Sequence, residues 1–201
     1  MDGVILDSEP AHFAAFQTTL QRRGKQLSED DYKANFAGLT DEAGFRKYFA
    51  SINETLDLPV VMAEKTAIYL ELASNRIVAY PGVVALIQEL SGKVPLALVT
   101  GSLRAEAHVA LIALGIKDCF SVIICAEDVK EGKPNPEGYL QAQKALSVSK
   151  DECVIVEDSP SGVLAAKNAG IISIAVTTTH TRAELSEGTR IVDVLSITDF
   201  L

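Results

Sequence analysis

The stretch VIVEDSPSG, residues 154–162, contains an apolar run that ends in two adjacent acidic residues. The run predicts a buried strand, and the Ser-Pro-Ser-Gly segment predicts the start of a helix directly after it. The strand therefore delivers Glu157 and Asp158 to its C-terminal end, where two carboxylates repel each other unless a hard cation lies between them. A site with few carboxylates, completed by phosphate and water, suits Mg²⁺. Taken alone, the stretch is equally consistent with Asp158 acting only as a helix cap.

Short β-branched runs alternate with helical patterns around this stretch, from about Tyr80 onward. Such alternation predicts repeated βα units and a parallel sheet. The predicted strands are residues 96–100, 122–125, 153–157 and 172–176, with 191–194 as a weaker candidate. The predicted helices are residues 83–90, 105–114, 136–146 and 162–169, and Gly115 and Gly170 lie where C-terminal caps belong. The sequence thus predicts a doubly wound, Rossmann-like α/β core.

Residues 11–78 differ from the rest, because they hold no convincing strand and their apolar residues recur at spacings of three and four. This periodicity, as in Phe13, Phe16 and Leu20, predicts amphipathic helices. The helical segment is inserted between the opening MDGVILDSEP and the first core helix, so we expect it to form a cap over the strand ends. The predicted domains are a core of residues 1–10 and 79–201 and a helical cap of residues 11–78.

A second loop, KEGKPNPEGY at residues 130–139, is stiffened by two prolines, and a helix is predicted to start at Pro136. Lys133 lies on this loop just past a predicted strand, in the crevice where open α/β sheets bind ligands. Its ammonium group is therefore a candidate partner for an anion. The alternative is a solvated surface lysine.

Two further segments are similar to parts of a phosphate site. LALVTGS, residues 96–102, ends a predicted strand in Thr100, Gly101 and Ser102, whose hydroxyl and free amides are candidate donors to phosphate oxygens. Threonines at strand ends are common, so this segment alone indicates little. The opening MDGVILDSEP is sharper, because an Asp-Gly pair, two apolar residues and an Asp-Ser-Glu run resemble the loop that follows a catalytic aspartate.

Together, the four segments resemble the haloacid dehalogenase superfamily, and within it the helical-cap phosphatases and the sugar-phosphate mutases. The resemblance spans nearly the whole chain and rests on DGVILDSEP, the run into TGS, GKPNPEGY and VIVEDSPSGV, in this order. It implies a Mg²⁺-dependent phosphohydrolase that works through an aspartyl-phosphate intermediate.

The resemblance also implies roles for individual residues. Asp2 matches the acid/base of an Asp-x-Asp motif, and its backbone carbonyl matches a metal ligand. Thr100 matches the hydroxyl that binds the transferring phosphoryl group, and Lys133 matches the cation that holds it. Asp158 matches a direct Mg²⁺ ligand, and Glu157 matches a residue that binds the metal directly or through water.

The nucleophile, the first aspartate of that motif, has no match because its position lies immediately before Met1. In the family, the strand that leads into it lies centrally, between the strand ending at Thr100 and the one ending at Glu157. We therefore expect this central strand to be missing and the 201-residue chain to be inactive or impaired. The functional protein is expected to extend upstream by about one strand.

Substrate specificity is expected to lie in the cap. The segment FAGLTDE, residues 36–42, resembles a family loop that reaches into the active site, which marks Gly38 and Thr40 as candidates. Arg46, close by in sequence, is a candidate partner for a second anionic group on the substrate. The alternative is that these residues form a solvated helix start.

Three functions remain open at this point. The leading hypothesis is a phosphatase for a small phosphate monoester, with a sugar phosphate as one candidate. A β-phosphoglucomutase-like phosphoryl transferase has the same four segments, but the cap position where those enzymes carry a basic residue holds Asp41 here. A non-catalytic phosphate- or metal-binding protein would have lost the nucleophile and kept the other site residues.

Composition disfavours several classes of partner. The formal net charge of −9 repels nucleic acid and anionic lipid. The three cysteines lack a CxxC spacing and the three histidines are scattered, which argues against a thiolate or histidine metal site. Neither an apolar run of membrane length nor a signal-peptide pattern is found, so we expect a cytoplasmic protein, and we expect a monomer because there is no coiled-coil pattern.

Overall fold

Residues 154–169 form a strand, a turn and a helix in the computed structural model, which describes residues 1–36 and 39–200. Strand β5 (Val154–Glu157) leads into helix α8 (Pro160–Ala169). The Ser159 hydroxyl caps α8 by accepting a hydrogen bond from the amide of Gly162, and the helix ends at Gly170 with a left-handed φ of 69°. Both predicted elements are confirmed. The alternative that Asp158 caps the helix is wrong, because Ser159 does so.

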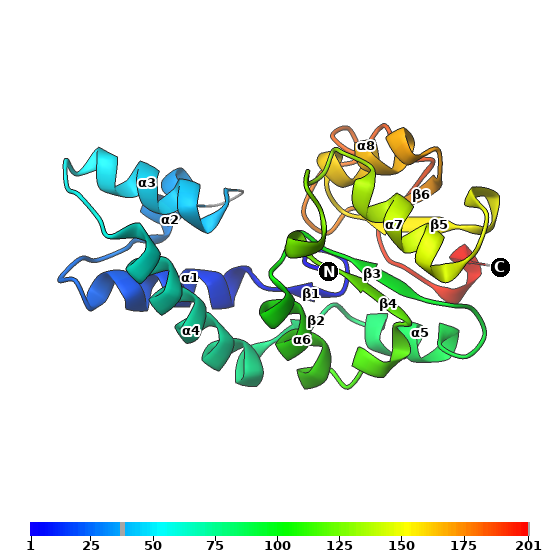
Figure 1. Ribbon diagram of the computed structural model, residues 1–201, viewed down its shortest axis with the longest axis horizontal. Coiled ribbons are helices and arrows are strands. Elements are labelled where there is room, and N and C mark those ends of the chain that lie inside the picture. Colours follow the sequence, from blue (N-terminus) through cyan, green and yellow to red (C-terminus); the bar gives the residue numbers. More distant parts are fainter. Residues whose placement is uncertain (37–38, 201) are drawn as a thin grey trace. The chain divides into compact units, whose positions relative to one another are not determined.

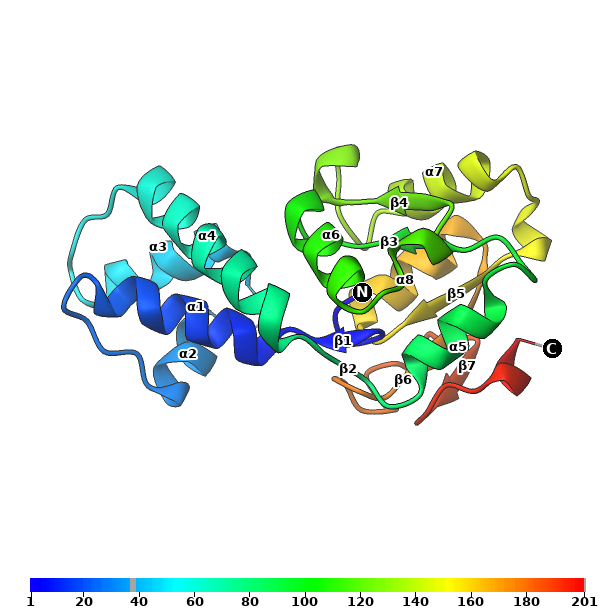
Figure 2. The same ribbon diagram turned by 90° about the horizontal axis from the view of Figure 1, so that it is seen from below.

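The core strands pair in parallel, in two groups (Figure 2). In one group β3 (Ala97–Val99) pairs with β4 (Val122–Ile124), from Ala97↔Val122 to Val99↔Ile124. In the other, β6 (Ile172–Val176) lies between β5 and β7 (Arg190–Val192). Within residues 1–36 and 39–200 no ladder joins the first group to the second. The central strand expected between them stays a prediction.

Helices cover both faces of these strands (Figure 1). Leu98 of β3 packs in one apolar cluster with buried residues of α5 (Val83–Leu90) and α6 (Arg104–Ala113). Its neighbour Val99 packs in another cluster, with Tyr139 of α7 (Glu137–Leu146) and with apolar residues of α8. Because successive strand residues point to opposite faces, the core is doubly wound, and the predicted α/β class is confirmed.

Several short elements were not predicted from the sequence. Strand β1 (Leu6–Asp7) pairs antiparallel with β2 (Val78–Ala79), and two-residue strands carry no detectable periodicity. Short 3₁₀ helices lie at η1 (Lys117–Cys119), η2 (Ala126–Asp128), η3 (Lys150–Glu152) and η4 (Ile197–Asp199). The β1–β2 pair lies where the chain passes between its two compact units, which are residues 1–7 with 77–201 and residues 8–76.

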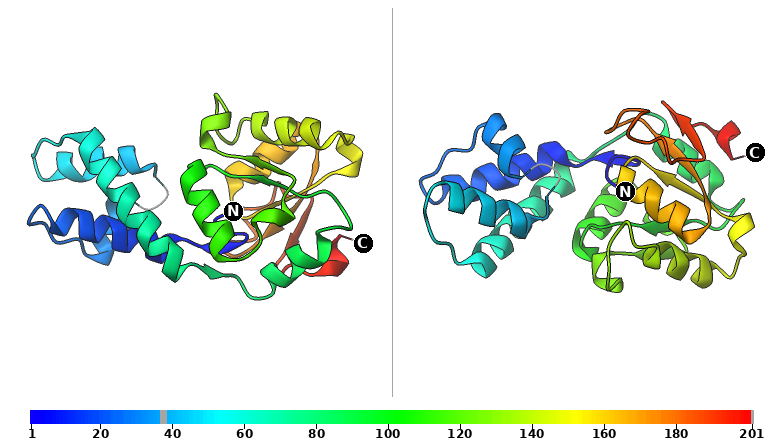
Figure 3. Two further views of the ribbon diagram at one scale, coloured as in Figure 1. Left: turned by 60° about the horizontal axis from the view of Figure 1, so that its bottom comes forward. Right: turned by 90° about the horizontal axis from the view of Figure 1, so that it is seen from above.

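The second unit is helical and is described here by itself. It contains α1 (Glu9–Gln21), α2 (Glu29–Asn35), α3 (Asp41–Ser51) and α4 (Leu58–Arg76), and α1 packs along α4 (Figure 3). Its core is rich in aromatic residues, among them Phe16, Phe36 and Phe45. No helix in the described part of the chain combines the length and the apolar character that a membrane span requires.

A lysine lies inside this aromatic core. The side chain of Lys65 has no exposed surface, and its ammonium nitrogen lies 2.7 Å from Oδ2 of Asp41 and 2.7 Å from Nδ1 of His12. The same nitrogen lies 4.9 Å from the ring centroids of both Phe16 and Tyr69. The buried charge is therefore compensated by an ion pair, a hydrogen bond and two aromatic faces.

Candidate functional site

The turn that follows β3 brings two hydroxyls toward the start of the chain. Thr100 is buried, its hydroxyl donates to Oγ of Ser102 at 3.0 Å, and the Ser102 amide donates back to Oγ1 of Thr100 at 3.1 Å. The Ser102 hydroxyl in turn donates to Oδ2 of Asp2 at 2.7 Å. Two of the predicted segments therefore meet at the Ser102–Asp2 hydrogen bond, and Gly101 lies between the two hydroxyl residues.

The loop before α7 brings Lys133 to the end of β5. Its ammonium forms an ion pair with Oε1 of Glu157, and the Lys133–Pro134 peptide bond is cis. The same Oε1 accepts a hydrogen bond from the hydroxyl of Tyr139, in the first turn of α7. Sequence reasoning missed Tyr139, which reads as an apolar-face residue of a helix. Lys133 is 23% exposed, so the alternative of a freely solvated surface lysine is wrong.

The second oxygen of Glu157 is engaged as well. Oε2 accepts from the Ser159 hydroxyl and from the Asp158 amide, each at 3.2 Å. Helix α8 approaches the carboxylate so closely that a Cβ on Gly162 would lie 2.0 Å from Oε2. In this arrangement Glu157 binds Lys133, while its predicted contribution to a metal site stays a prediction.

Electrostatics at this pair favour the ionised carboxylate. Burial acts to raise the pKa of Glu157, but the Lys133 ammonium and the hydrogen bonds from Lys133 and Tyr139 outweigh it, and the pKa lies below its ordinary value. Burial, together with the Glu157 charge, raises the pKa of the Tyr139 hydroxyl far above its ordinary value. At neutral pH the Tyr139 hydroxyl is therefore protonated and donates its hydrogen bond to an ionised Glu157 carboxylate.

Asp158 occupies a different environment on the other side of the same strand end. Its carboxylate lies directly against Gly3, where a Cβ would be 1.9 Å from Oδ2, and Gly3 has a left-handed φ of 71°. The Thr179 hydroxyl donates to Oδ2 of Asp158. Burial raises the pKa of Asp158, and the nearby Glu157 charge acts in the same direction. A neighbouring cation would stabilise the ionised form of a carboxylate in this setting.

The amino group of Met1 lies where these segments meet. It is buried, and burial lowers its pKa, with the charges of Asp2, Lys133, Glu157 and Asp158 acting on it. The backbone just before Asp2 therefore lies among the lysine and the acidic residues that the sequence singled out.

Whether these residues fit Mg²⁺ can be tested on their donor atoms. Within the described ranges, no three Asp, Glu, His or Cys side chains gather as a ready-made metal cluster. Mg²⁺ rarely needs such a cage, because it keeps water ligands and is bound through one or two carboxylates plus substrate phosphate. Asp158 supplies one carboxylate, and its contact with Gly3 puts it beside the Asp2–Gly3 backbone. The donor set fits a magnesium ion held by few protein groups.

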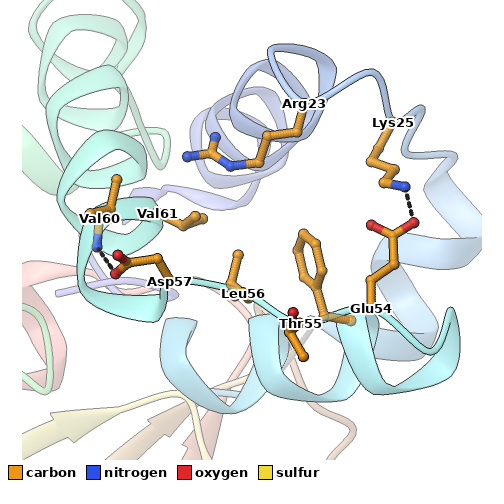
Figure 4. Close-up of a pocket in the computed structure, with 9 residues that line it drawn as sticks. Arg23, Lys25, Glu54, Thr55, Leu56, Asp57, Val60 and Val61 are labelled. Carbon is orange, nitrogen blue, oxygen red and sulfur yellow. Dashed lines mark hydrogen bonds and ion pairs between the residues drawn. The ribbon is translucent and has the colours of Figure 1, made fainter.

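Two cavities lie near charged residues. One, of about 210 Å³, is lined by Thr100, Gly101, Lys133 and Tyr139 together with apolar residues of β3 and β4. The other, of about 280 Å³, lies within the helical unit, and Figure 4 shows Lys25 paired with Glu54 at its rim. None of the predicted site residues lines the second cavity. The first is the one that contacts the candidate site.

The substrate-binding candidates in the helical unit are Gly38, Thr40 and Arg46, and the two that the structure describes have different partners. Thr40 accepts a hydrogen bond from the amide of Ala43 at 3.3 Å and so caps α3, as the alternative of a helix start proposed. Arg46 is 67% exposed and pairs with Glu42 one turn away. Gly38 lies outside the described residues. A substrate-binding role for these three residues stays a prediction.

A parallel sheet whose strand ends hold a lysine, hydroxyls and acidic side chains is typical of α/β proteins that bind anionic ligands at this edge. Residues 1–176 match the family model of the haloacid dehalogenase-like hydrolases. The chain belongs to this family, and it is a hydrolase of the α/β, Rossmann-like type.

Relatives and solved structures agree with this assignment. The chain is 34% identical over 190 residues to validoxylamine A 7′-phosphate phosphatase of Streptomyces hygroscopicus subsp. limoneus, covering 93% of this chain and 87% of the relative. It is 34% identical over 176 residues to the phosphorylated carbohydrates phosphatase of Thermotoga maritima, covering 85% and 79%. The fold is similar to the crystal structure of β-phosphoglucomutase from Clostridium difficile, with a TM-score of 0.77, 25% identity and coverage of 99% and 92%.

Proposed function

We propose that this protein is a Mg²⁺-dependent phosphatase that hydrolyses a small phosphate monoester, with a sugar phosphate as the preferred candidate. The observation that carries the proposal is that Asp2, Lys133 and Asp158 lie close enough to the Met1 nitrogen for their charges to act on it, with Ser102 hydrogen-bonded to Asp2. The two phosphatase relatives act, by their names, on validoxylamine A 7′-phosphate and on phosphorylated carbohydrates. This supports the substrate class.

Each group has a role in the proposed reaction. Lys133, held at the end of β5 by its ion pair with Glu157, binds the phosphoryl oxygens, and the hydroxyl turn at Thr100 and Ser102 supplies hydrogen-bond donors. Asp2 carries the proton to the leaving oxygen and later takes one from the attacking water, and its hydrogen bond from Ser102 holds the carboxylate in place. Asp158 and the Asp2 carbonyl would hold Mg²⁺, which when bound neutralises phosphate charge.

The attacking carboxylate is proposed to belong to an aspartate directly before Met1, which forms an aspartyl-phosphate. The Met1 nitrogen supports this position, because it is buried among the charges of Lys133, Glu157 and Asp158. Both groups of parallel strands have an open edge in the described part of the chain, which fits a strand leading into that aspartate.

The test compares three chains: residues 1–201, the same chain preceded by an apolar strand that ends in Asp, and a copy in which that Asp is Asn. Phosphate release from a panel of sugar phosphates is measured with Mg²⁺ and with a chelator. We expect turnover in the Asp-extended chain with Mg²⁺ alone, and none with Asn. Equal turnover by residues 1–201 would overturn the nucleophile assignment, and no release by any chain would overturn the phosphatase.

A β-phosphoglucomutase-like transferase is the second candidate, because the similar crystal structure from Clostridium difficile has that activity by name. Against it, the cap position expected to be basic in such enzymes holds Asp41, which is bound to Lys65 within the helical unit. The same chains, incubated with a hexose 1-phosphate, separate the two. Isomerisation without phosphate release would favour the mutase.

A further inference from the structure

The loop after β6 contains three consecutive threonines whose hydroxyls have three different partners. Thr177 donates to Oδ1 of Asp193 at 2.7 Å, which is a surface contact near β7. The next two threonines turn the other way, toward the candidate site. Three side chains of the same type on adjacent residues thus differ in function in a way that the sequence does not reveal.

Thr178 and Thr179 bind the two sides of one close backbone contact. The Thr178 hydroxyl donates to the carbonyl oxygen of Gly3, and the Thr179 hydroxyl donates to Oδ2 of Asp158. Thr179 also lies 3.2 Å from the backbone oxygen of Asp158. Because Gly3 and the Asp158 carboxylate touch, the two hydroxyls together hold the Asp2–Gly3 turn and Asp158 against each other.

His180 adds a further contact to the same residue. Its Nδ1 lies 3.0 Å from the backbone oxygen of Asp158 and 2.8 Å from the Thr179 hydroxyl oxygen. Since the Thr179 hydrogen is directed to Oδ2, an Nδ1–H of His180 satisfies both distances as donor. Asp158 is therefore held from its side chain by Thr179 and from its backbone by His180.

We infer that Thr179 is a positioning residue that fixes the Asp158 carboxylate for Mg²⁺ and so sets the magnesium affinity of the site. This inference rests on the proposed function. A hydroxyl bonded to Oδ2 selects one rotamer of Asp158 and directs the remaining lone pairs away from Thr179. Residues that hold a ligand in this way typically change metal affinity by about 10- to 100-fold when they are removed.

The test uses the magnesium dissociation constant, measured by titration calorimetry on residues 1–201 and on the Asp-extended chain. Thr179→Val keeps the shape of the side chain and removes the hydroxyl, and we expect it to weaken Mg²⁺ binding by about tenfold. Thr179→Ser restores the hydroxyl and should restore the affinity. Thr177→Val is the matched control, because it removes a neighbouring hydroxyl that bonds Asp193 and, among the described residues, forms no hydrogen bond with a member of the candidate site.

Thermal unfolding without Mg²⁺ separates positioning from folding, and we expect the same midpoint for Thr179→Val and Thr177→Val. An unchanged dissociation constant in Thr179→Val would overturn the inference while leaving the phosphatase intact. So would equal weakening by Thr179→Val and Thr179→Ser. Absence of Mg²⁺ binding by the unsubstituted chains would overturn both this inference and the magnesium part of the proposed function.

Discussion

Oδ2 of Asp41 lies 2.7 Å from Nζ of Lys65, whose side chain has no exposed surface. Removing one partner of such a pair leaves a buried charge uncompensated. We expect Asp41→Asn to lower the free energy of unfolding by about 2 kcal/mol, less than for a fully buried pair because the Asp41 side chain is 25% exposed. Urea unfolding measures the change.

The control for this change is Glu42→Gln, in the same first turn of α3, since Glu42 pairs with the exposed Arg46. It should cost no more than about 0.5 kcal/mol. Adding Lys65→Met to Asp41→Asn should recover part of the loss, because the buried charge is then gone. If Asp41→Asn and Glu42→Gln lower the free energy of unfolding equally, the buried Asp41–Lys65 pair stabilises the fold no more than an exposed pair does.

Gly3 lies against Asp158, and we expect Gly3→Ala to displace that carboxylate. A Cβ there would lie 1.9 Å from Oδ2, and because its position is fixed by the backbone, the Asp158 side chain has to move. Phosphate release in the Asp-extended chain should fall by about 100-fold, the effect of losing one well-placed charge-stabilising group. Gly115→Ala is the matched control, with a similar φ of 66° and no atom within 4 Å of the added Cβ. Comparable activity in both variants would show that the contact is irrelevant to the reaction.

Lys133→Ala removes the cation at the end of β5. We expect kcat/KM of the Asp-extended chain to fall by about 100-fold or more, because the phosphoryl oxygens lose their fixed positive partner. Lys144→Ala, at the exposed end of α7, should leave kcat/KM unchanged. Steady-state assays with one sugar phosphate suffice. A full-rate Lys133→Ala enzyme would remove Lys133 from the site.

Glu157 gives the protein a defined acid sensitivity. Its pKa in the folded protein lies below the ordinary value of 4.5, chiefly because Lys133 outweighs the effect of burial. The ionised group therefore stabilises the folded state above about pH 4.5, and this contribution is lost as the pH falls through the lower, folded-state pKa. Glu157→Gln should flatten the fall in unfolding free energy below pH 4.5. Urea unfolding at each pH measures this free energy for the unsubstituted protein and for Glu157→Gln. If the two free energies fall in parallel below pH 4.5, the prediction is wrong.

The spacing of apolar residues along the sequence was sufficient to predict the longer helices and strands. Helix α5 and strand β6 begin and end where their patterns predicted, because burial of one helix face or of a whole strand leaves a clear period in the sequence. The β1–β2 pair was not predicted, since two residues are too few to show alternation. Its pairing depends on residues about seventy positions apart in the chain.

The candidate site was predictable in part for the same reason. Glu157 and Lys133 stand out locally, one at the end of an apolar run and one between prolines. Their partner Tyr139 and the donor Thr179 do not, because a tyrosine on a helix and a threonine in a polar run have many ordinary explanations. The pairing of Ser102 with Asp2 is likewise set by tertiary packing and by no spacing in the sequence.

Strands β3 and β5 each have one side that no other described strand occupies. Exposed strand edges are templates for pairing with another molecule, which makes them sites of self-association and aggregation. The net charge of −9 opposes such contacts at low ionic strength, and salt screens that repulsion. The colloidal behaviour of residues 1–201 should therefore depend strongly on salt, and light scattering across a salt series would measure it.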